Sequence, residues 1–198
     1  MGQLATNLLT LARLDAGRQH LEHEVLDLAE LAAAVARRVS TLAAEKGLVV
    51  GVDDRPSRPA LPRRSRMSGY RKRGRAGEDR PVLVGDRQAV EQAALILVEN
   101  AIKYTPPGGT VTLRTAATDG QAHLIVEDSG VGIPPEHLRH LGERFYRVDP
   151  ARARAAGGAG LGLAIAFQIA AAHGGTLKIT SAPGRGTRVT LSLAASGR

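Results

Sequence analysis

The stretch GGAGLGLAIAFQIAAAHGG, residues 157–175, places a cluster of glycines directly before the most hydrophobic helical run of the chain. Glycine inside a helix costs up to about 1 kcal/mol relative to alanine. A cluster of glycines at a helix start therefore indicates that another group must come close to the backbone there. A flexible turn before a core helix explains the same pattern, and this stretch alone does not separate the two hypotheses.

The length and composition of the chain limit the classes of protein to which it can belong. With 198 residues it suits one domain plus an appendage. It contains no cysteine, which excludes disulfides and cysteine-based zinc sites and fits a reducing compartment. No run of about 18 consecutive apolar residues occurs, so the sequence predicts no membrane-spanning helix.

The net charge of +8 comes from one segment rather than from a domain face. Residues 55–80 hold ten Lys and Arg residues and two acidic residues, whereas the rest of the chain is neutral. Because this segment is rich in Pro, Gly, Ser and Arg and has no apolar period, we expect a basic, disordered loop at 54–80. A nucleic-acid binder that uses this loop is the alternative. The two Phe, three Tyr and absent Trp offer few rings for base stacking, so no nucleic acid is expected as a partner.

Apolar periodicity predicts the order of helices and strands. Helices are expected at 3–16, 25–45, 86–104, 135–142 and 161–173, and strands at 48–52, 82–86, 110–117, 122–129, 176–182 and 186–194. A loop rich in Ala, Arg and Gly is expected at 149–160. This order predicts an α+β fold, a two-layer α/β sandwich whose mixed, mostly antiparallel sheet carries helices on one face, preceded by an N-terminal helix.

The common phosphate-binding motifs are absent from the sequence. No glycine precedes a lysine, which excludes GxxxxGK[ST], and Leu163 occupies the position of the last glycine of GxGxxG. Four other blocks remain: ENAIKYT (99–105), EDSGVGIP (127–134), ERFYR (143–147) and GAGLGL (158–163). Any nucleotide site must therefore be built from a different pattern.

The side chains of these blocks suit the parts of a purine triphosphate. Asp128 ends an apolar strand, where a carboxylate can accept a hydrogen bond from an exocyclic amine. Asn100 and Lys103 share one helix face, where an amide oxygen suits Mg²⁺ and an ammonium suits phosphate. The glycines at 158–162 supply free N–H groups at a helix N-terminus. Each residue alone also fits a structural role, as a turn cap or a surface residue, but the combination is more specific.

Together, the four blocks resemble the N, G1, F and G2 boxes of the catalytic and ATP-binding domain of sensor histidine kinases. That domain belongs to the ATPase superfamily that includes gyrase B, Hsp90 and MutL. The resemblance covers about residues 82–193, and the ERFYR block and the ending HGGTLKITSAPGRGTRVTLSL (173–193) favour the kinase branch. It implies that the protein binds ATP and Mg²⁺.

The resemblance also implies roles for individual residues. Asn100 would coordinate Mg²⁺ and Lys103 would contact phosphate, both in catalytic roles, while Asp128 would bind the adenine amine. Phe145 would anchor an ATP lid that runs to Gly160. The residues that the resemblance places around the nucleotide are Asn100, Lys103, Tyr104, Asp128, Gly130, Gly132, Ile133, Phe145, Gly158, Gly160, Leu161, Gly162, Leu163 and Thr187.

The chain departs from the family pattern in two places. Family N boxes usually carry an asparagine four residues before the Mg²⁺-binding one, where this chain has Ile96, and we expect weakened Mg·ATP binding or slowed transfer. The motif around the phosphate-accepting histidine, on the first helix of the family's dimerisation hairpin, is absent. NLLTLARLDAG (7–17) resembles only the end of that hairpin's second helix.

We therefore expect residues 1–20 to form the C-terminal part of a dimerisation hairpin helix and residues 21–198 to form the kinase domain. The implied enzyme is a protein-histidine kinase that transfers the γ-phosphoryl group of ATP to a histidine outside this chain. The implied partners are an acceptor-histidine helix, a response regulator receiver domain and a second copy bound through the N-terminal helix. The implied location is the cytoplasm, alone or as the cytoplasmic part of a membrane-bound sensor. The alternative is a nucleotide-binding pseudokinase or interaction module without transfer activity.

Overall fold

The computed structural model describes residues 23–53, 80–118, 120–148 and 159–195. Its strands are β1 (Glu24–Asp27), β2 (Val49–Asp53), β3 (Val82–Gly85), β4 (Thr110–Thr118), β5 (Gln121–Asp128), β6 (Thr176–Ser181) and β7 (Thr187–Ala194). Its helices are α2 (Leu28–Glu45), α3 (Arg87–Tyr104), α4 (Pro135–Leu138) and α6 (Gly162–Ala172). The helix predicted at 3–16, the hairpin segment 1–20 and most of the loops predicted at 54–80 and 149–160 lie outside these residues.

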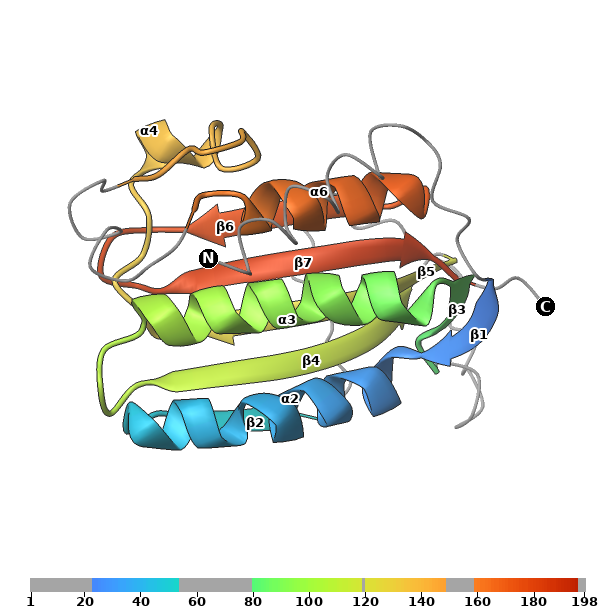
Figure 1. Ribbon diagram of the computed structural model, residues 1–198, viewed down its shortest axis with the longest axis horizontal. Coiled ribbons are helices and arrows are strands. Elements are labelled where there is room, and N and C mark those ends of the chain that lie inside the picture. Colours follow the sequence, from blue (N-terminus) through green and yellow to red (C-terminus); the bar gives the residue numbers. More distant parts are fainter. Residues whose placement is uncertain (1–22, 54–79, 119, 149–158, 196–198) are drawn as a thin grey trace, which may run out of the picture.

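The main sheet has five strands in the order β2-β4-β5-β7-β6. Strands β2 and β4 run parallel, and the other three pairs run antiparallel. Helices α2, α3 and α6 lie along one face of this sheet, with α3 between the other two (Figure 1). The predicted two-layer α/β sandwich with a mixed, mostly antiparallel sheet is therefore confirmed.

A second sheet consists of β1 and β3, which pair antiparallel with Leu26 opposite Leu83. Both leucines are fully buried. This pairing corrects the helix predicted over 25–45, because the helix begins only at Leu28, where Asp27 Oδ1 accepts a hydrogen bond of 2.8 Å from the Ala29 N–H. Residues 24–27 pair with a strand that is distant in sequence, and a local pattern does not contain that information.

Helix α3 crosses the middle of the helical layer. Asp86 caps its N-terminus by accepting a hydrogen bond of 2.9 Å from the Ala89 N–H, as the sequence predicts. Its buried face is an apolar stripe, formed by Ala89, Val90, Ala93, Ala94, Leu97, Val98, Ala101 and Ile102. The helix predicted at 135–142 is shorter than expected, because α4 ends at Leu138 and the chain then turns toward Gly142, which faces the Phe167 ring. Across the described ranges, no helix combines the length and hydrophobicity that crossing a membrane requires.

His173 joins the C-terminus of α6 to the N-terminus of α3. Its Nδ1 lies 2.8 Å from the Ile169 carbonyl oxygen, and its Nε2 lies 3.1 Å from the Asp86 backbone N. A carbonyl can only accept and an N–H can only donate, so Nδ1 carries the proton and Nε2 is the acceptor. His173 is also the C-cap of α6. A Cβ at Gly85 would lie 2.7 Å from the imidazole Cδ2, so this position requires glycine.

Candidate functional site

The Asp128 carboxylate stands at the end of β5, where described residues bond only one of its two oxygens. Oδ1 accepts hydrogen bonds from the Gly130 N–H at 2.8 Å and the Thr187 N–H at 3.1 Å. Within the described residues, Oδ2 makes no hydrogen bond. Burial raises the pKa of Asp128 above its ordinary value, and the two backbone hydrogen bonds oppose this by a smaller amount. Two backbone N–H groups thus orient the carboxylate through Oδ1, and Oδ2 can accept a hydrogen bond from a ligand.

The two glycines that follow Asp128 allow the chain to pass close to two other backbone segments. A Cβ at Gly130 would lie 2.7 Å from the Tyr104 carbonyl oxygen, and the next residue, Val131, donates its N–H to that same oxygen at 3.2 Å. Gly132 has a φ of 70°, and a Cβ there would lie 1.9 Å from the Ala182 carbonyl oxygen. The glycines therefore place the Asp128 loop between the end of α3 and the β6–β7 turn.

Ser181 and Gly186 belong to this site, although the sequence patterns did not reveal them. Ser181 Oγ accepts the Ile133 N–H at 2.9 Å, donates to the Gly186 carbonyl oxygen at 2.7 Å and lies 3.0 Å from Thr187 Oγ1. A Cβ at Gly186 would lie 1.9 Å from the Asp128 carbonyl oxygen. The sequence signal for Gly186 was its place in the PGRG turn (183–186), but a serine at a strand end carries no recognisable signal.

The C-terminal turn of α3 carries Asn100, Lys103 and Tyr104 beside the Asp128 loop. Asn100 is partly buried, and its side chain has no hydrogen bond within the described residues. Lys103 Nζ lies 5.4 Å from the centroid of the Tyr104 ring. Lys46 Nζ donates to the carbonyl oxygens of Ile102 at 2.6 Å and Lys103 at 2.7 Å, which satisfies two acceptors at the helix end.

Arg147 brings a second cation to Lys103, and the sequence patterns assigned it no role. Burial lowers the pKa of Lys103, and the positive charge of Arg147 lowers it further. Burial raises the pKa of Tyr104, and Arg147 opposes this shift. Arg147 Nη2 is buried and has no hydrogen-bond partner in the described part of the chain. Two neighbouring cations, one with an unused donor, form a site suited to a multiply charged anion.

Phe145, the middle residue of the ERFYR block, makes a tight backbone contact with Gly160. Phe145 has a φ of 65°, which is rare for a non-glycine residue, and its N–H donates to the Gly160 carbonyl oxygen at 2.9 Å. Gly160 has a φ of 70°, and a Cβ there would lie 2.8 Å from the Phe145 carbonyl carbon. The two residues meet at the two ends of the segment expected to be a lid, and Gly158 lies outside the described residues.

Helix α6 begins at Gly162 beside the residue that departs from the family pattern. A Cβ at Gly162 would lie 3.3 Å from Ile96 Cγ2, so an apolar side chain of α3 faces the start of α6. Leu161 is fully buried, and Leu163 packs against the core. Within the part of the chain that the structure describes, no side chain caps the first turn of α6, whose N-terminal N–H groups suit an anion.

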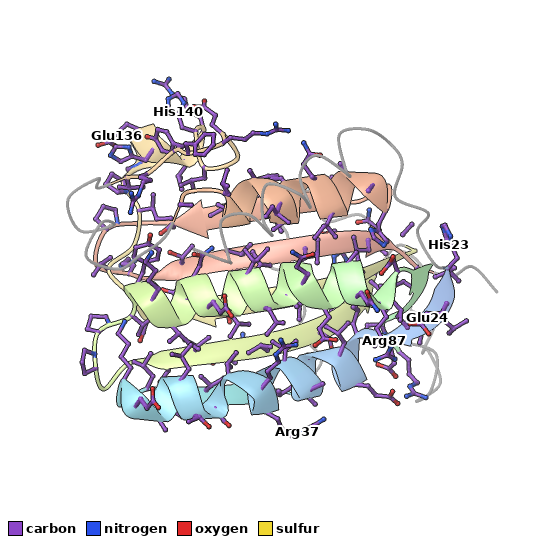
Figure 2. The ribbon with its side chains drawn as sticks, viewed as in Figure 1. His23, Glu24, Arg37, Arg87, Glu136 and His140 are labelled. Atoms are coloured by element: carbon purple, nitrogen blue, oxygen red, sulfur yellow. The ribbon has the colours of Figure 1, made fainter. Side chains whose placement is uncertain are left out.

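Histidines of the α4 region hold the ERFYR block in place. His137 Nδ1 lies 2.7 Å from the Tyr146 hydroxyl, and His140 Nδ1 lies 2.6 Å from Glu143 Oε1. Figure 2 shows His140 and Glu136 at one extremity of the molecule, on the segment around α4. These contacts fix the residue that directly precedes Arg147.

The residues present fit Mg²⁺ and a polyphosphate. Among the described residues, no three His, Cys, Asp or Glu side chains gather in a way that could hold a metal ion. The Asn100 amide could supply one oxygen ligand, and Mg²⁺ commonly binds through few protein ligands, retaining waters and phosphate oxygens. Lys103 and Arg147 supply the charge that phosphates require.

Sequence comparison relates this chain to one family of ATPases. Residues 85–197 match the family described as histidine kinase-, DNA gyrase B- and HSP90-like ATPase. The sensor histidine kinase CusS of Escherichia coli K12 is 34% identical over 195 residues, which cover 98% of this chain and 35% of CusS. The sensor histidine kinase YkoH of Bacillus subtilis is 45% identical over 106 residues, which cover 54% of this chain and 23% of YkoH. The chain thus spans about a third or less of these two curated relatives.

Solved structures show the same fold. Full-length ShkA in complex with AMPPNP has a TM-score of 0.75 and 27% identity, and the match covers 99% of this chain and 36% of ShkA. The mycobacterial sensor histidine kinase MprB has a TM-score of 0.64 and 29% identity, and the match covers 89% of this chain and 99% of that structure. The chain belongs to the histidine kinase-, DNA gyrase B- and HSP90-like ATPase family.

Proposed function

We propose that this chain is the ATP-binding catalytic domain of a two-component sensor histidine kinase. The observation that carries the proposal is the hydrogen bond from the Val131 N–H to the Tyr104 carbonyl oxygen. It joins the loop that follows the hydrogen-bond acceptor Asp128 to the end of α3, which carries Asn100 and Lys103. An adenine amine and a polyphosphate have the matching chemistry and are covalently linked in ATP.

Each residue has a distinct task in this proposal. Asp128 Oδ2 accepts a hydrogen bond from the adenine amine, and Gly130 and Gly132 keep the wall of the base pocket free of side chains. Lys103, Arg147 and the first N–H groups of α6 bind the phosphates, while Asn100 supplies the protein ligand to Mg²⁺. When bound at Asn100, Mg²⁺ would supply positive charge that offsets the negative charge of the phosphates.

The reaction is γ-phosphoryl transfer to an imidazole. A nitrogen of the acceptor histidine forms a bond to the γ-phosphorus, while the bond from this phosphorus to the β,γ-bridging oxygen breaks and ADP leaves with the electron pair. The protein contributes position and positive charge rather than covalent chemistry. Closure of the segment between Phe145 and Gly160 excludes water and limits hydrolysis.

The proposed partners are those of a phosphorelay in the cytoplasm. An acceptor-histidine helix from another segment or chain receives the phosphoryl group, and a receiver domain of a response regulator takes it from there. A second copy of the protein binds through residues 1–20. The names of the relatives, which are sensor histidine kinases, support this assignment.

A nucleotide-binding pseudokinase is the second candidate. It is supported by Ile96, whose methyl group faces Gly162 where a polar side chain would help to hold a hydrated metal. In this case the domain binds ATP without transferring phosphate and acts through nucleotide-dependent contacts.

A transfer assay in trans separates the two candidates. The purified chain is mixed with an acceptor hairpin from a related kinase and with ATP labelled at the γ-phosphate, and nucleotide binding is measured by calorimetry in parallel. Acid-labile label on the acceptor histidine, absent with Asp128→Ala, supports the kinase. ATP binding without label supports the pseudokinase, and absence of ATP binding rejects both.

A further inference from the structure

The hydrogen bonds of the Ser181 hydroxyl determine which of Ser181 and Thr187 donates in the hydrogen bond between them. Serine has one proton to donate, and the Gly186 carbonyl oxygen, which can only accept, takes it at 2.7 Å. Ser181 Oγ already accepts the Ile133 N–H at 2.9 Å, so it meets Thr187 Oγ1 at 3.0 Å with a lone pair. Thr187 must therefore donate its own proton to Ser181.

Among the described residues around Asp128, this arrangement leaves the Thr187 hydroxyl as an acceptor. Once Thr187 donates to Ser181, its Oγ1 presents lone pairs alone to any other partner. The backbone N–H groups of Gly130 and Thr187 are likewise used, because both donate to Asp128 Oδ1. As a carboxylate, Asp128 can only accept hydrogen bonds through Oδ2. Thr187 and Asp128 are joined through the Thr187 N–H, and each residue thus offers the base an oxygen that can only accept.

We propose that Ser181 is a positioning residue that sets the specificity of the site for purines with a 6-amino group over purines with a 6-oxo group. The 6-amino group of adenine offers protons to such acceptors, whereas the 6-oxo group of hypoxanthine or guanine would face them with lone pairs. Ser181 acts through Thr187 and does not contact the base. This inference rests on the proposed nucleotide function and adds the origin of its base selectivity.

The Ser181→Ala substitution releases the Thr187 hydroxyl. The freed hydroxyl can rotate and donate to a 6-oxo group, so binding of the 6-oxo purine improves relative to binding of the 6-amino purine. The Ile133 N–H and the Gly186 carbonyl also lose a partner, and the resulting loosening weakens both nucleotides alike. The ratio of the two affinities therefore separates the effect of the released Thr187 hydroxyl from that of general structural damage.

The experiment compares ATP with ITP, its 6-oxo analogue, by calorimetry on the full chain. We expect ATP to be preferred by the wild type and Ser181→Ala to reduce the ATP-to-ITP affinity ratio by about tenfold, as expected for one hydrogen bond. Ser181→Thr serves as a second variant. Because it keeps the hydroxyl, we expect it to have the wild-type ATP-to-ITP affinity ratio. Ser192→Ala is the matched control, because it removes a buried hydroxyl of β7 that bonds His123 at 2.9 Å, five residues beyond Thr187.

The outcomes distinguish this inference from the proposed function. A ratio that falls in Ser181→Ala and not in Ser192→Ala supports the inference. An unchanged ratio in Ser181→Ala, with ATP still bound, overturns it and leaves the nucleotide function standing. If Ser181→Ala does not fold, a Ser181→Thr ratio below that of the wild type overturns it as well. A wild-type chain that binds neither nucleotide overturns both proposals.

Discussion

The backbone N–H of Phe145 donates to the carbonyl oxygen of Gly160 at 2.9 Å, and both residues have positive φ. Phe145 holds this conformation at a cost in backbone strain that glycine does not bear. Gly160 provides the room, because a Cβ there would meet three backbone atoms of Phe145 within 3.0 Å. The contact therefore ties together the two ends of the segment that we propose closes over ATP.

Substitution of Gly160 by alanine tests this contact. The new methyl group must displace the Phe145 backbone, so we expect ATP affinity to fall on the order of tenfold. Gly120→Ala is the matched control, because Gly120 also has a positive φ but would place its Cβ in open space. Both variants bear the same conformational penalty, about 1–2 kcal/mol. Calorimetric titration with equal losses in both variants would refute a specific role for the contact.

Asp128→Asn separates binding from stability. The amide keeps the Oδ1 acceptor for Gly130 and Thr187 but replaces the second acceptor by a donor, so we expect ATP affinity to fall about 10- to 100-fold. Because burial raises the pKa of Asp128, the ionised carboxylate destabilises the nucleotide-free fold. Thermal unfolding without nucleotide should therefore show a higher midpoint for Asp128→Asn at neutral pH.

The pH dependence of that difference has a definite sign. A carboxyl whose pKa is raised in the folded state contributes most to stability when protonated, and this contribution is lost as the pH rises through the folded-state pKa. The advantage of Asp128→Asn should thus shrink as the pH falls below the raised pKa. An advantage that stays constant with pH would show that ionisation is not its cause.

Arg147→Gln tests the cationic pair. Removal of one charge relieves repulsion with Lys103 and eliminates a buried donor without a partner, so the nucleotide-free protein should unfold at a higher temperature. ATP affinity should fall, and its dependence on salt should weaken. Arg37→Gln makes the same charge change on the exposed side of α2 and serves as the control (Figure 2). A similar loss of affinity in both variants would indicate a long-range effect of net charge.

Ile96→Asn tests the departure from the family pattern. The amide would stand beside Gly162 and offer a second oxygen toward the metal, so we expect the gain in ATP affinity on adding Mg²⁺ to increase. Since Ile96 also packs against the core, the variant should lose about 1–3 kcal/mol of stability. Ile96→Val removes a methyl group without adding a ligand and should leave the Mg²⁺ effect unchanged. No gain in Ile96→Asn would mean that the site has adapted to isoleucine.

The parts of the fold that sequence patterns predicted are those that local periodicity encodes. Helix α3 shows this, because its cap at Asp86 and its apolar stripe both lie within one continuous segment. Strand β1 was missed, because its partner β3 follows more than fifty residues later and Val25 fits a helical stripe equally well. Only the tertiary pairing of Leu26 with Leu83 decides between strand and helix.

The same limit applies to the candidate site. Asp128 and its glycines form a recognisable block because one loop contains them. Arg147 belongs to the ERFYR block, but the block alone assigns it no role, and Ser181 stands outside the four blocks, where a serine is ordinarily a surface residue. Their significance arises from neighbours such as Lys103 and Thr187, which only folding brings to them.

The single proton of the His173 ring gives the molecule a spectroscopic reporter. Because Nδ1 donates within α6 and Nε2 accepts from the start of α3, the two ring nitrogens should give well separated ¹⁵N resonances characteristic of one tautomer. Sliding of one helix past the other would break the Nε2 contact and average these signals. Nuclear magnetic resonance of this one side chain can therefore follow whether nucleotide binding shifts the helical layer, without a label in the site itself.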